Sequence, residues 1–418
     1  MAHPSSEDLP VDKVRDLIRA VCEPLGRQRT REKIALETSL GRILAEDILS
    51  PIDIPSANNS AMDGYAFNGS VLSGHETISL EVAHTIFAGH TEKCVIASGT
   101  CARIMTGAPL PDGCDTVIPQ ELVKVDDQFI RFQRDLVRPG DNVRLRGEEL
   151  STGQLALAQG QMLSPAHLGL LAGLGIAQVS VYQKVSVGFF STGSELRSLG
   201  ETLDSGSAYD SNRYTLMGML TRLGVQTHDF GIVRDDPKAL REVFHKALKT
   251  CDVIITSGGV SVGQADYTKQ IMQEFGSIDF WKVAMRPGRP MAFGHLKAAE
   301  DEALLFGLPG NPVAVMVTFY QFVQEALHLL GGGQSLEPLL VNAVLAEPIR
   351  KRAGRTEYQR GICQRLANGQ LEVRTTGSQG SGMLSSMVAA NCLIVLDHEQ
   401  ESLNVGDTVP VQLFNGLI

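Results

Sequence analysis

The chain has 418 residues, a formal net charge of −10, 43% hydrophobic residues and 20% charged residues. This length predicts about three or four domains, and the composition is typical of a globular soluble protein. No apolar run approaches the roughly 18 residues that span a bilayer, and the first residues lack a signal region. We therefore expect a cytoplasmic protein with no membrane partner. Because the sequence shows no basic run, we expect no nucleic-acid partner. The 7 cysteines are scattered and form no Cys-x-x-Cys pair, which argues against a disulfide framework and a structural zinc site.

Residues 1–180 are expected to form an N-terminal region in which a helical linker unit carries an inserted domain. Apolar residues at helical spacing over Val11–Val21 predict an amphipathic helix. Short β-type runs separated by turns predict that the inserted domain is β-rich and covers about residues 51–140. The sequence leaves open whether residues 141–180 return to the unit that residues 27–50 begin.

Residues 181–331 alternate apolar strands with helices. The predicted strands are 185–190, 225–233, 253–256 and 304–308, and the predicted helices are 212–223, 236–249, 267–275 and 312–330. This alternation implies right-handed crossovers and a central parallel α/β sheet covered on both faces. Ligands bind such sheets at the carboxyl ends of the strands, where the intervening loops lie.

Residues 338–418 follow a glycine-rich linker and are expected to form a small C-terminal β-barrel or sandwich. Strand-like stretches occur at 341–345, 360–366, 371–376, 392–396 and 409–414. Asn368-Gly369, between two of them, is a hairpin signal. The chain as a whole is thus predicted to be an α/β multidomain protein.

The loop that begins at Ser257 is the strongest candidate for binding a ligand. It contains Gly258, Gly259 and Ser261, and it directly follows a buried strand. It has neither the Lys-Ser/Thr of a Walker loop nor a Gly-x-Gly-x-x-Gly pattern. Glycines at this place still let the backbone approach a ligand and point several N–H groups at it. We predict that the loop binds an anionic, phosphorylated small molecule; a plain tight turn is the alternative.

Carboxylates follow three strands of the same predicted sheet. Asp266 stands where the next helix begins, and its simple role would be an N-cap. A bare carboxylate about 4 Å from a phosphate would cost a few kcal/mol at an effective dielectric near 20. A phosphate in this loop therefore predicts a bridging divalent cation, and Mg²⁺ prefers such mixed oxygen ligands. Glu195 and Asp235 suggest the same role, although each alone could be a cap or a solvated carboxylate.

Lys282, Arg286 and Arg289 supply positive charge after another strand, on a loop stiffened by two prolines. A solvated basic loop explains the spacing equally well. Arg360 and the loop 377–382 could form a second oxyanion pocket.

Several motifs resemble those of the MoeA family, the molybdopterin molybdenumtransferases related to the E domain of gephyrin, and they occur in the family's order along the chain. The segments that carry the resemblance are 60–66, 105–109, 191–196, 257–267 and 307–312, together with those around Arg360 and Ser381. The likeness extends over essentially the whole chain.

The resemblance implies an elongated homodimer with an N-terminal linker and dimerisation domain. It also implies insertion of molybdate into adenylylated molybdopterin, with Mg²⁺-dependent release of AMP. Where the motifs of this chain match those of the family, the resemblance implies that the functional residues are Asp63, Thr106, Glu195, Asp235, Asp266, Lys282, Arg360 and Ser381. It also implies that Pro309, Gly310, Asn311 and Pro312 shape the pocket. Asp266 and Glu195 would hold the metal, and residues near 63 and 106 would act on the partner subunit. Other cofactor-biosynthesis proteins and acceptor molybdoenzymes are implied as further partners.

Two positions depart from the pattern, since Arg286 stands where a lysine is expected and Glu149 where an aspartate is expected. Arginine at 286 keeps the positive charge but replaces the compact ammonium group of lysine with a planar guanidinium group. Glutamate at 149 differs from aspartate only in its longer side chain.

Two other functions stay open. One is an adenylyltransferase that makes the adenylylated pterin, and the other is a non-catalytic scaffold like the gephyrin E domain.

Overall fold

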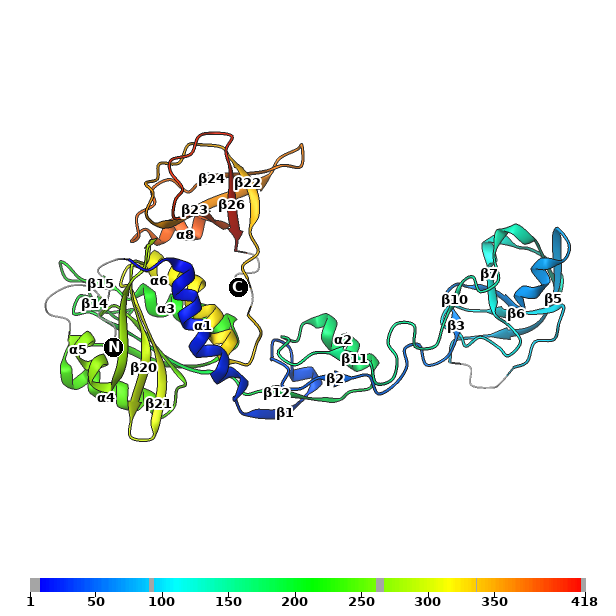
Figure 1. The fold of residues 1–418 in the computed structure, drawn as a ribbon, viewed down its shortest axis with the longest axis horizontal. Coiled ribbons are helices and arrows are strands. Elements are labelled where there is room, and N and C mark those ends of the chain that lie inside the picture. The colour runs from blue at the N-terminus through cyan, green and yellow to red at the C-terminus, as the bar shows by residue number, and fades with distance from the viewer. Residues whose placement is uncertain (1–7, 90–93, 261–266, 336, 415–418) are drawn as a thin grey trace.

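The computed structural model shows an elongated molecule, with an α/β unit and a C-terminal barrel at one end and a β-rich unit at the other (Figure 1). It describes residues 8–89, 94–260, 267–335 and 337–414. The predictions for Ser261 and Asp266 concern residues outside these ranges.

The α/β unit is built on a six-stranded sheet in the order β16-β13-β17-β21-β20-β18. The strands are β13 Ser186–Thr192, β16 Gln226–Val233, β17 Val253–Ser257, β18 Gly276–Lys282, β20 Pro290–Ala298 and β21 Asp301–Leu308. The first four strands in the sheet are parallel, but β20 pairs antiparallel with both of its neighbours. The sheet is thus parallel at its centre and mixed at one edge, because a tight hairpin after Ala298, not a helical crossover, joins β20 to β21.

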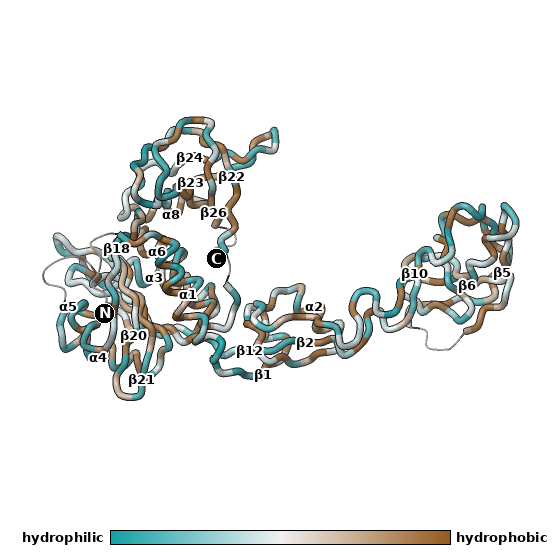
Figure 2. The backbone as a smooth tube through the Cα atoms, viewed as in Figure 1, coloured by the Kyte–Doolittle hydropathy of each residue, from teal (hydrophilic) through white to brown (hydrophobic). Residues whose placement is uncertain are grey.

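Helices cover both faces of this sheet, which explains why β17 is buried along its whole length. Val253 and Ile255 face one core, to which α3 (Ser211–Arg222) and the continuous helical segment 312–330 contribute. Ile254 faces the other core, which contains apolar side chains of α4 (Pro237–Leu248) and α5 (Tyr267–Phe275). Figure 2 shows apolar stretches along strands of this sheet such as β20 and β21, and others in the remaining units.

The first helix, α1 (Val11–Arg27), belongs to this packing although it precedes the linker unit in sequence. Its buried residues Val14, Ile18 and Cys22 join the same core as Val253. The helical segment opposite it runs through α6 (Pro312–Thr318), η5 (Phe319–Val323) and α7 (Gln324–Leu330). This segment is long and apolar enough to span a membrane, so the expectation that no apolar run approaches that length is wrong for residues 312–330. However, 78% of its most apolar stretch is buried inside the protein. It is therefore a core helix.

The linker unit is formed by two separate stretches of chain, which resolves the question that the sequence left open. β1 (Arg31–Ala35) pairs with β12 (Gln178–Tyr182), and β2 (Ile48–Leu49) pairs with β11 (Leu155–Leu157). The β-rich unit inserted between them has a six-stranded sheet of β4 Gly64–Phe67, β5 Thr77–Ile86, β6 Thr100–Ile104, β7 Thr116–Pro119, β8 Lys124–Asp126 and β9 Phe129–Gln133.

The C-terminal strands close into a barrel, since β23 pairs with β24 on one side and with β25 on the other. The strands are β22 Val341–Leu345, β23 Thr356–Arg365, β24 Leu371–Thr375, β25 Cys392–Leu396 and β26 Thr408–Leu413. A short strand of the α/β unit, β19 (Met285–Arg286), adds to β23 in parallel. The barrel is therefore joined to the α/β unit by backbone pairing beside Arg286.

Candidate functional site

A cavity of about 780 Å³ lies at the carboxyl ends of the parallel strands, between the α/β unit and the barrel. Its lining comes from the loops after β13, β16, β17, β18 and β21 and from one barrel loop. The lining residues are Thr192–Glu195, Asp235, Gly258–Val260, Thr268, Arg286–Pro290, Pro309–Asn311, Ala314 and Gln379–Ser381. Nine of the predicted site residues meet here: Glu195, Asp235, Gly258, Gly259, Arg286, Pro309, Gly310, Asn311 and Ser381.

The loop after β17 can take its shape only with glycine at two positions. Gly258 has φ of 92° and Gly259 has φ of 70°, a backbone region that side chains disfavour. A Cβ atom at Gly258 would lie 2.5 Å from the carbonyl oxygen of Thr192, and one at Gly259 would lie 2.5 Å from Cβ of Thr268. The loop therefore packs tightly against two neighbours while its backbone borders the cavity.

Asn212, which no motif in the sequence indicated, holds two of the cavity loops together. Its Nδ2 donates hydrogen bonds to Ser257 Oγ at 2.8 Å and to the carbonyl oxygen of Gly310 at 2.7 Å. Ser257 is consequently buried in the wall and is not part of the lining, unlike the prediction that it contacts the ligand. The only sequence signal for Asn212 is its place in the first turn of α3, after the N-cap Asp210.

Two carboxylates line one side of the cavity. The Glu195 carboxylate folds over Gly193, where an added Cβ would lie 2.7 Å from both carboxylate oxygens. Oδ1 of Asp235 is buried and has no hydrogen-bond partner in the described part of the chain. Within those same ranges no three His, Cys, Asp or Glu residues are grouped as a metal site. A cation here would therefore need ligands from the substrate, from water or from Asp266, which is not described.

Two arginines line the opposite side. Arg289 donates through Nε and Nη2 to the two carboxylate oxygens of Asp8, both at 2.8 Å, and this interaction lowers the pKa of Asp8. Arg286 Nη1 lies 3.7 Å from Glu357 Oε1, and its side chain is 64% exposed. Lys282 is exposed at the end of β18 but does not line the cavity.

Arg360 is placed differently from the prediction, because its side chain is almost completely buried and does not line the cavity. Its guanidinium donates to Ser386 Oγ and to the carbonyl oxygen of Gly380, both at 3.0 Å. Burial, and then the nearby charge of Arg286, lower the pKa of Arg360 to about 10. In this structure Arg360 shapes the barrel loop that carries Ser381.

Arg360→Met should lower the free energy of unfolding by about 2–4 kcal/mol, because the Gly380 carbonyl and the Ser386 hydroxyl lose a charged donor in a buried place. Urea denaturation measures this change. Arg365→Met, at an exposed position on the same strand, is the control and should change stability by less than about 0.5 kcal/mol. Equal stability of the two variants would contradict the structural role of Arg360.

Ser381 and Pro312 mark the contact between the barrel and the helix that begins at the cavity. The carbonyl oxygen of Ser381 accepts a hydrogen bond of 3.1 Å from the backbone N–H of Val313. Pro312 occupies the first position of α6, where its missing N–H costs nothing. Pro312 itself is not in the lining, whereas Ser381 and Asn311 are.

Asp63 and Thr106 lie in the β-rich unit, at the opposite end of the molecule from the cavity (Figure 1). Oδ1 of Asp63 accepts hydrogen bonds from the hydroxyl and from the backbone N–H of Thr106, both at 2.7 Å. These two bonds hold the pKa of Asp63 below its usual range. Glu149 is exposed between the linker unit and the β-rich unit. None of the three contributes to the cavity of its own chain.

Three family models match consecutive parts of the chain. They describe a MoeA N-terminal region (domain I and II) over residues 9–175, a probable molybdopterin binding domain over residues 188–329, and a MoeA C-terminal region (domain IV) over residues 342–414. The second of these contains most of the residues that line the cavity.

Known proteins are similar along almost the entire chain. The molybdopterin molybdenumtransferase of Haemophilus influenzae is 42% identical, and the match covers 93% of this chain and 95% of the relative. The enzyme of the same name from Nostoc sp. is 36% identical, with 96% and 94% covered. The crystal structure of a molybdopterin biosynthesis moeA protein from Pyrococcus horikoshii matches with a TM-score of 0.82 at 29% identity and covers 98% of this chain and all of that one. The chain therefore belongs to the MoeA family of molybdopterin molybdenumtransferases.

Proposed function

We propose that the chain inserts molybdate into adenylylated molybdopterin and releases AMP, giving molybdenum cofactor. The observation that supports this most directly is that a glycine loop, two carboxylates and two arginines line the same cavity. The relatives named molybdopterin molybdenumtransferase support the same reaction class.

The cavity has an acidic side and a basic side, and the proposed reactants need both. Arg286 and Arg289 present planar guanidinium groups, which bind oxyanions such as molybdate through paired N–H donors. The backbone at Gly258 and Gly259 suits the phosphate groups of the pterin and its adenylyl link. Molybdate is therefore assigned to the arginine side, near Ser381, and the phosphates to the glycine loop.

Glu195 and Asp235 are assigned to Mg²⁺, together with Asp266. The buried, unpartnered Oδ1 of Asp235 fits this assignment, since a buried carboxylate oxygen normally has a partner. Two carboxylates with phosphate oxygens and water form a ligand set that Mg²⁺ accepts. When bound, the ion would neutralise the charge that develops on the phosphate as the adenylyl link is cleaved.

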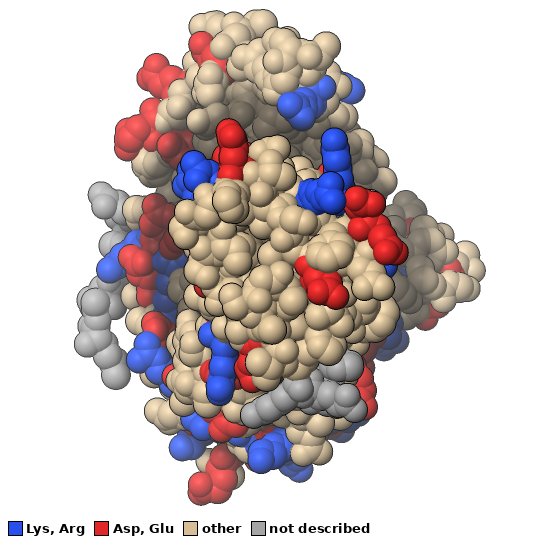
Figure 3. All heavy atoms as spheres, turned by 90° about the vertical axis from the view of Figure 1, so that its right-hand side faces the viewer, with Lys and Arg blue, Asp and Glu red and all other residues tan. Residues whose placement is uncertain are grey.

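A homodimer would bring Asp63 and Thr106 to the cavity of a second chain, because they cannot reach the cavity of their own. The β-rich end of the molecule supports such a contact. Figure 3 shows that charges of both signs are scattered there around a broad uncharged surface. Phe87, Val125 and Phe129 are exposed in this unit, and burying such side chains favours association.

We place the reaction in the cytoplasm, with other cofactor-biosynthesis proteins supplying the pterin and acceptor molybdoenzymes receiving the product. The names of the relatives, molybdopterin molybdenumtransferase and molybdopterin biosynthesis moeA protein, support the place in cofactor biosynthesis. The buried setting of the apolar helix 312–330 agrees with the cytoplasmic location.

The proposal is tested by incubating the purified chain with adenylylated molybdopterin, molybdate and Mg²⁺ and measuring AMP. We expect AMP release that depends on molybdate and stops when the metal is chelated. The finished cofactor should activate an apo-molybdoenzyme. Synthesis of adenylylated pterin from ATP would indicate an adenylyltransferase instead, and the absence of any turnover would leave the scaffold function.

A further inference from the structure

A second hollow lies beside the cavity, between the barrel and the loop after β18. Its volume is about 1180 Å³, larger than the cavity of about 780 Å³, and Arg286 lines both. Most of its wall comes from residues 348–357, which lead into β23, and the rest from residues 402–404. The proposed reaction assigns no role to this hollow.

The lining of this hollow is strongly basic. Its charged residues are Arg286, Arg350, Lys351, Arg352, Arg355 and Glu357, which is five cations and one carboxylate. The chain as a whole has 37 basic and 47 acidic residues, so the local excess has the opposite sign. The sequence-based statement that the chain has no basic run is wrong for this segment, where four cations fall within six residues.

Three of the cations already have partners that hold them in place. Lys351 is 6% exposed, and its Nζ donates to the carbonyl oxygen of Gln400 at 2.6 Å. This ammonium has a backbone partner but no carboxylate within ion-pair distance in the described ranges, and burial lowers its pKa. Arg355 Nε lies 3.7 Å from Asp8, which Arg289 also binds. Arg286 faces Glu357, as described above.

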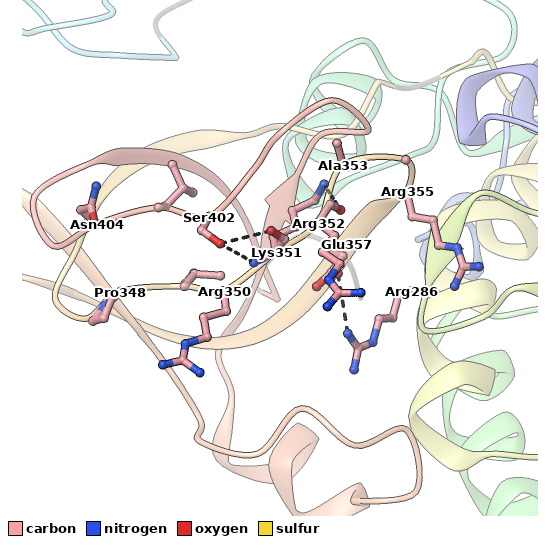
Figure 4. A pocket seen from close by; sticks show the side chains of 13 residues that line it. Arg286, Pro348, Arg350, Lys351, Arg352, Ala353, Arg355, Glu357, Ser402 and Asn404 are labelled. Atoms are coloured by element: carbon pink, nitrogen blue, oxygen red, sulfur yellow. Dashed lines mark hydrogen bonds and ion pairs between the residues drawn. The ribbon is translucent and has the colours of Figure 1, made fainter.

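Arg350 and Arg352 are different, because their guanidinium groups are exposed and have no ion pair or hydrogen bond in the part of the chain that the structure describes. Figure 4 shows both side chains, together with Arg286, projecting from the walls of the hollow. The guanidinium groups of Arg350 and Arg352 are thus left without an ion-pair partner among the described residues, and the buried Lys351 ammonium adds a third positive charge beside them. An anion bound there would supply the missing partner.

We propose that this hollow is a second anion-binding site, which captures a small tetrahedral dianion and delivers it to the cavity past Arg286. Exposed guanidinium groups that line the same hollow suit such a ligand, since each offers paired N–H donors to two oxygens. A concentrated positive potential also raises the local concentration of anions and their association rate, which matters on a protein with a net charge of −10. The dianion could be free molybdate on its way in or the phosphate of AMP on its way out. That the dianion is a reactant rests on the proposed function, but the existence of the site does not.

The test uses the purified full chain and the double variant Arg350→Gln/Arg352→Gln. Binding of molybdate alone, inorganic phosphate alone and AMP alone is measured by calorimetry at low ionic strength. The KM for molybdate and kcat are measured in the complete reaction. The control, Arg365→Gln/Arg374→Gln, makes the same change of charge on exposed barrel residues that do not line the hollow.

We expect the double variant to bind molybdate and phosphate about tenfold more weakly and to raise the KM for molybdate about tenfold, with kcat unchanged. The control should leave all of these values unchanged, and added salt should abolish the difference. Weaker binding of AMP, with molybdate binding unaffected, would identify the AMP phosphate as the dianion. Unchanged binding of all three anions would overturn the proposal. If no turnover occurs but anion binding weakens, the proposed function fails and the site stands.

Discussion

A purified heterodimer of an Asp63→Ala chain and a Glu195→Gln chain should have about half of the wild-type activity, although each variant alone loses activity on the order of 100-fold. The reason is the distance within one chain. Asp63 lies in the β-rich unit and Glu195 at the cavity, at opposite ends of the molecule (Figure 1). If each site uses Asp63 of one chain and Glu195 of the other, the heterodimer contains one intact site and one doubly altered site.

Two affinity tags, one on each chain, allow the heterodimer to be isolated, and AMP release measures its activity. Asp126→Ala is the control, because this exposed carboxylate lies in the same β-rich unit and, among the described residues, forms an ion pair with Arg131 alone, at 3.4 Å. It should keep wild-type activity. A heterodimer as inactive as either homodimer would show that both residues act at the same chain's site, or that Asp63 has a different role.

Gly259→Ala should abolish turnover while the matched change Gly224→Ala leaves it intact. Both glycines have nearly the same positive φ angle, 70° and 69°. An alanine at either position therefore carries a similar strain of about 1–2 kcal/mol. At Gly224 the added Cβ would meet nothing within 4 Å, whereas at Gly259 it would lie 2.5 Å from the side chain of buried Thr268. Relieving that overlap must displace the loop that borders the cavity.

Urea denaturation should show Gly259→Ala to be less stable than Gly224→Ala by a further 1–3 kcal/mol or so, the usual cost of overpacking. Turnover is then compared under conditions in which circular dichroism shows both variants to be folded. Full activity in Gly259→Ala would mean that the loop tolerates displacement and does not bind the phosphates. Loss of activity in Gly224→Ala would mean that backbone strain alone, at a position remote from the cavity, is sufficient to abolish turnover.

The sequence predicted the elements of the α/β unit well because their signals are local. The apolar run at Val253, the proline at 237 and the glycines after Ser257 each report on a few neighbouring residues, and the strands and helices lie within a few residues of the prediction. β20 was not among the predicted strands. Its direction was not predictable in the same way. This direction depends on whether the chain returns by a hairpin or by a helix. The stretch before β21 shows no clear hydrophobic periodicity that would decide between the two.

The site was harder to predict, because which residues face the cavity depends on packing between distant segments. Arg360 has a side chain that suits an oxyanion, yet the barrel buries it against Ser386 and Gly380. Asn212 looks like an ordinary residue of a helix start, and only the fold brings its amide to Ser257 and Gly310. Contacts of this kind leave no periodic pattern in one sequence.

The hydrogen bond between the backbone N–H of Val313 and the carbonyl oxygen of Ser381 has an evolutionary consequence. Because main-chain atoms form it, side-chain substitutions at either position leave this link between barrel and helix available, apart from a proline at 313, which would remove the donor. The residue at 381 can therefore vary to suit a different oxyanion without detaching the loop that carries it. New specificity could arise at this wall of the cavity while the two units keep their alignment.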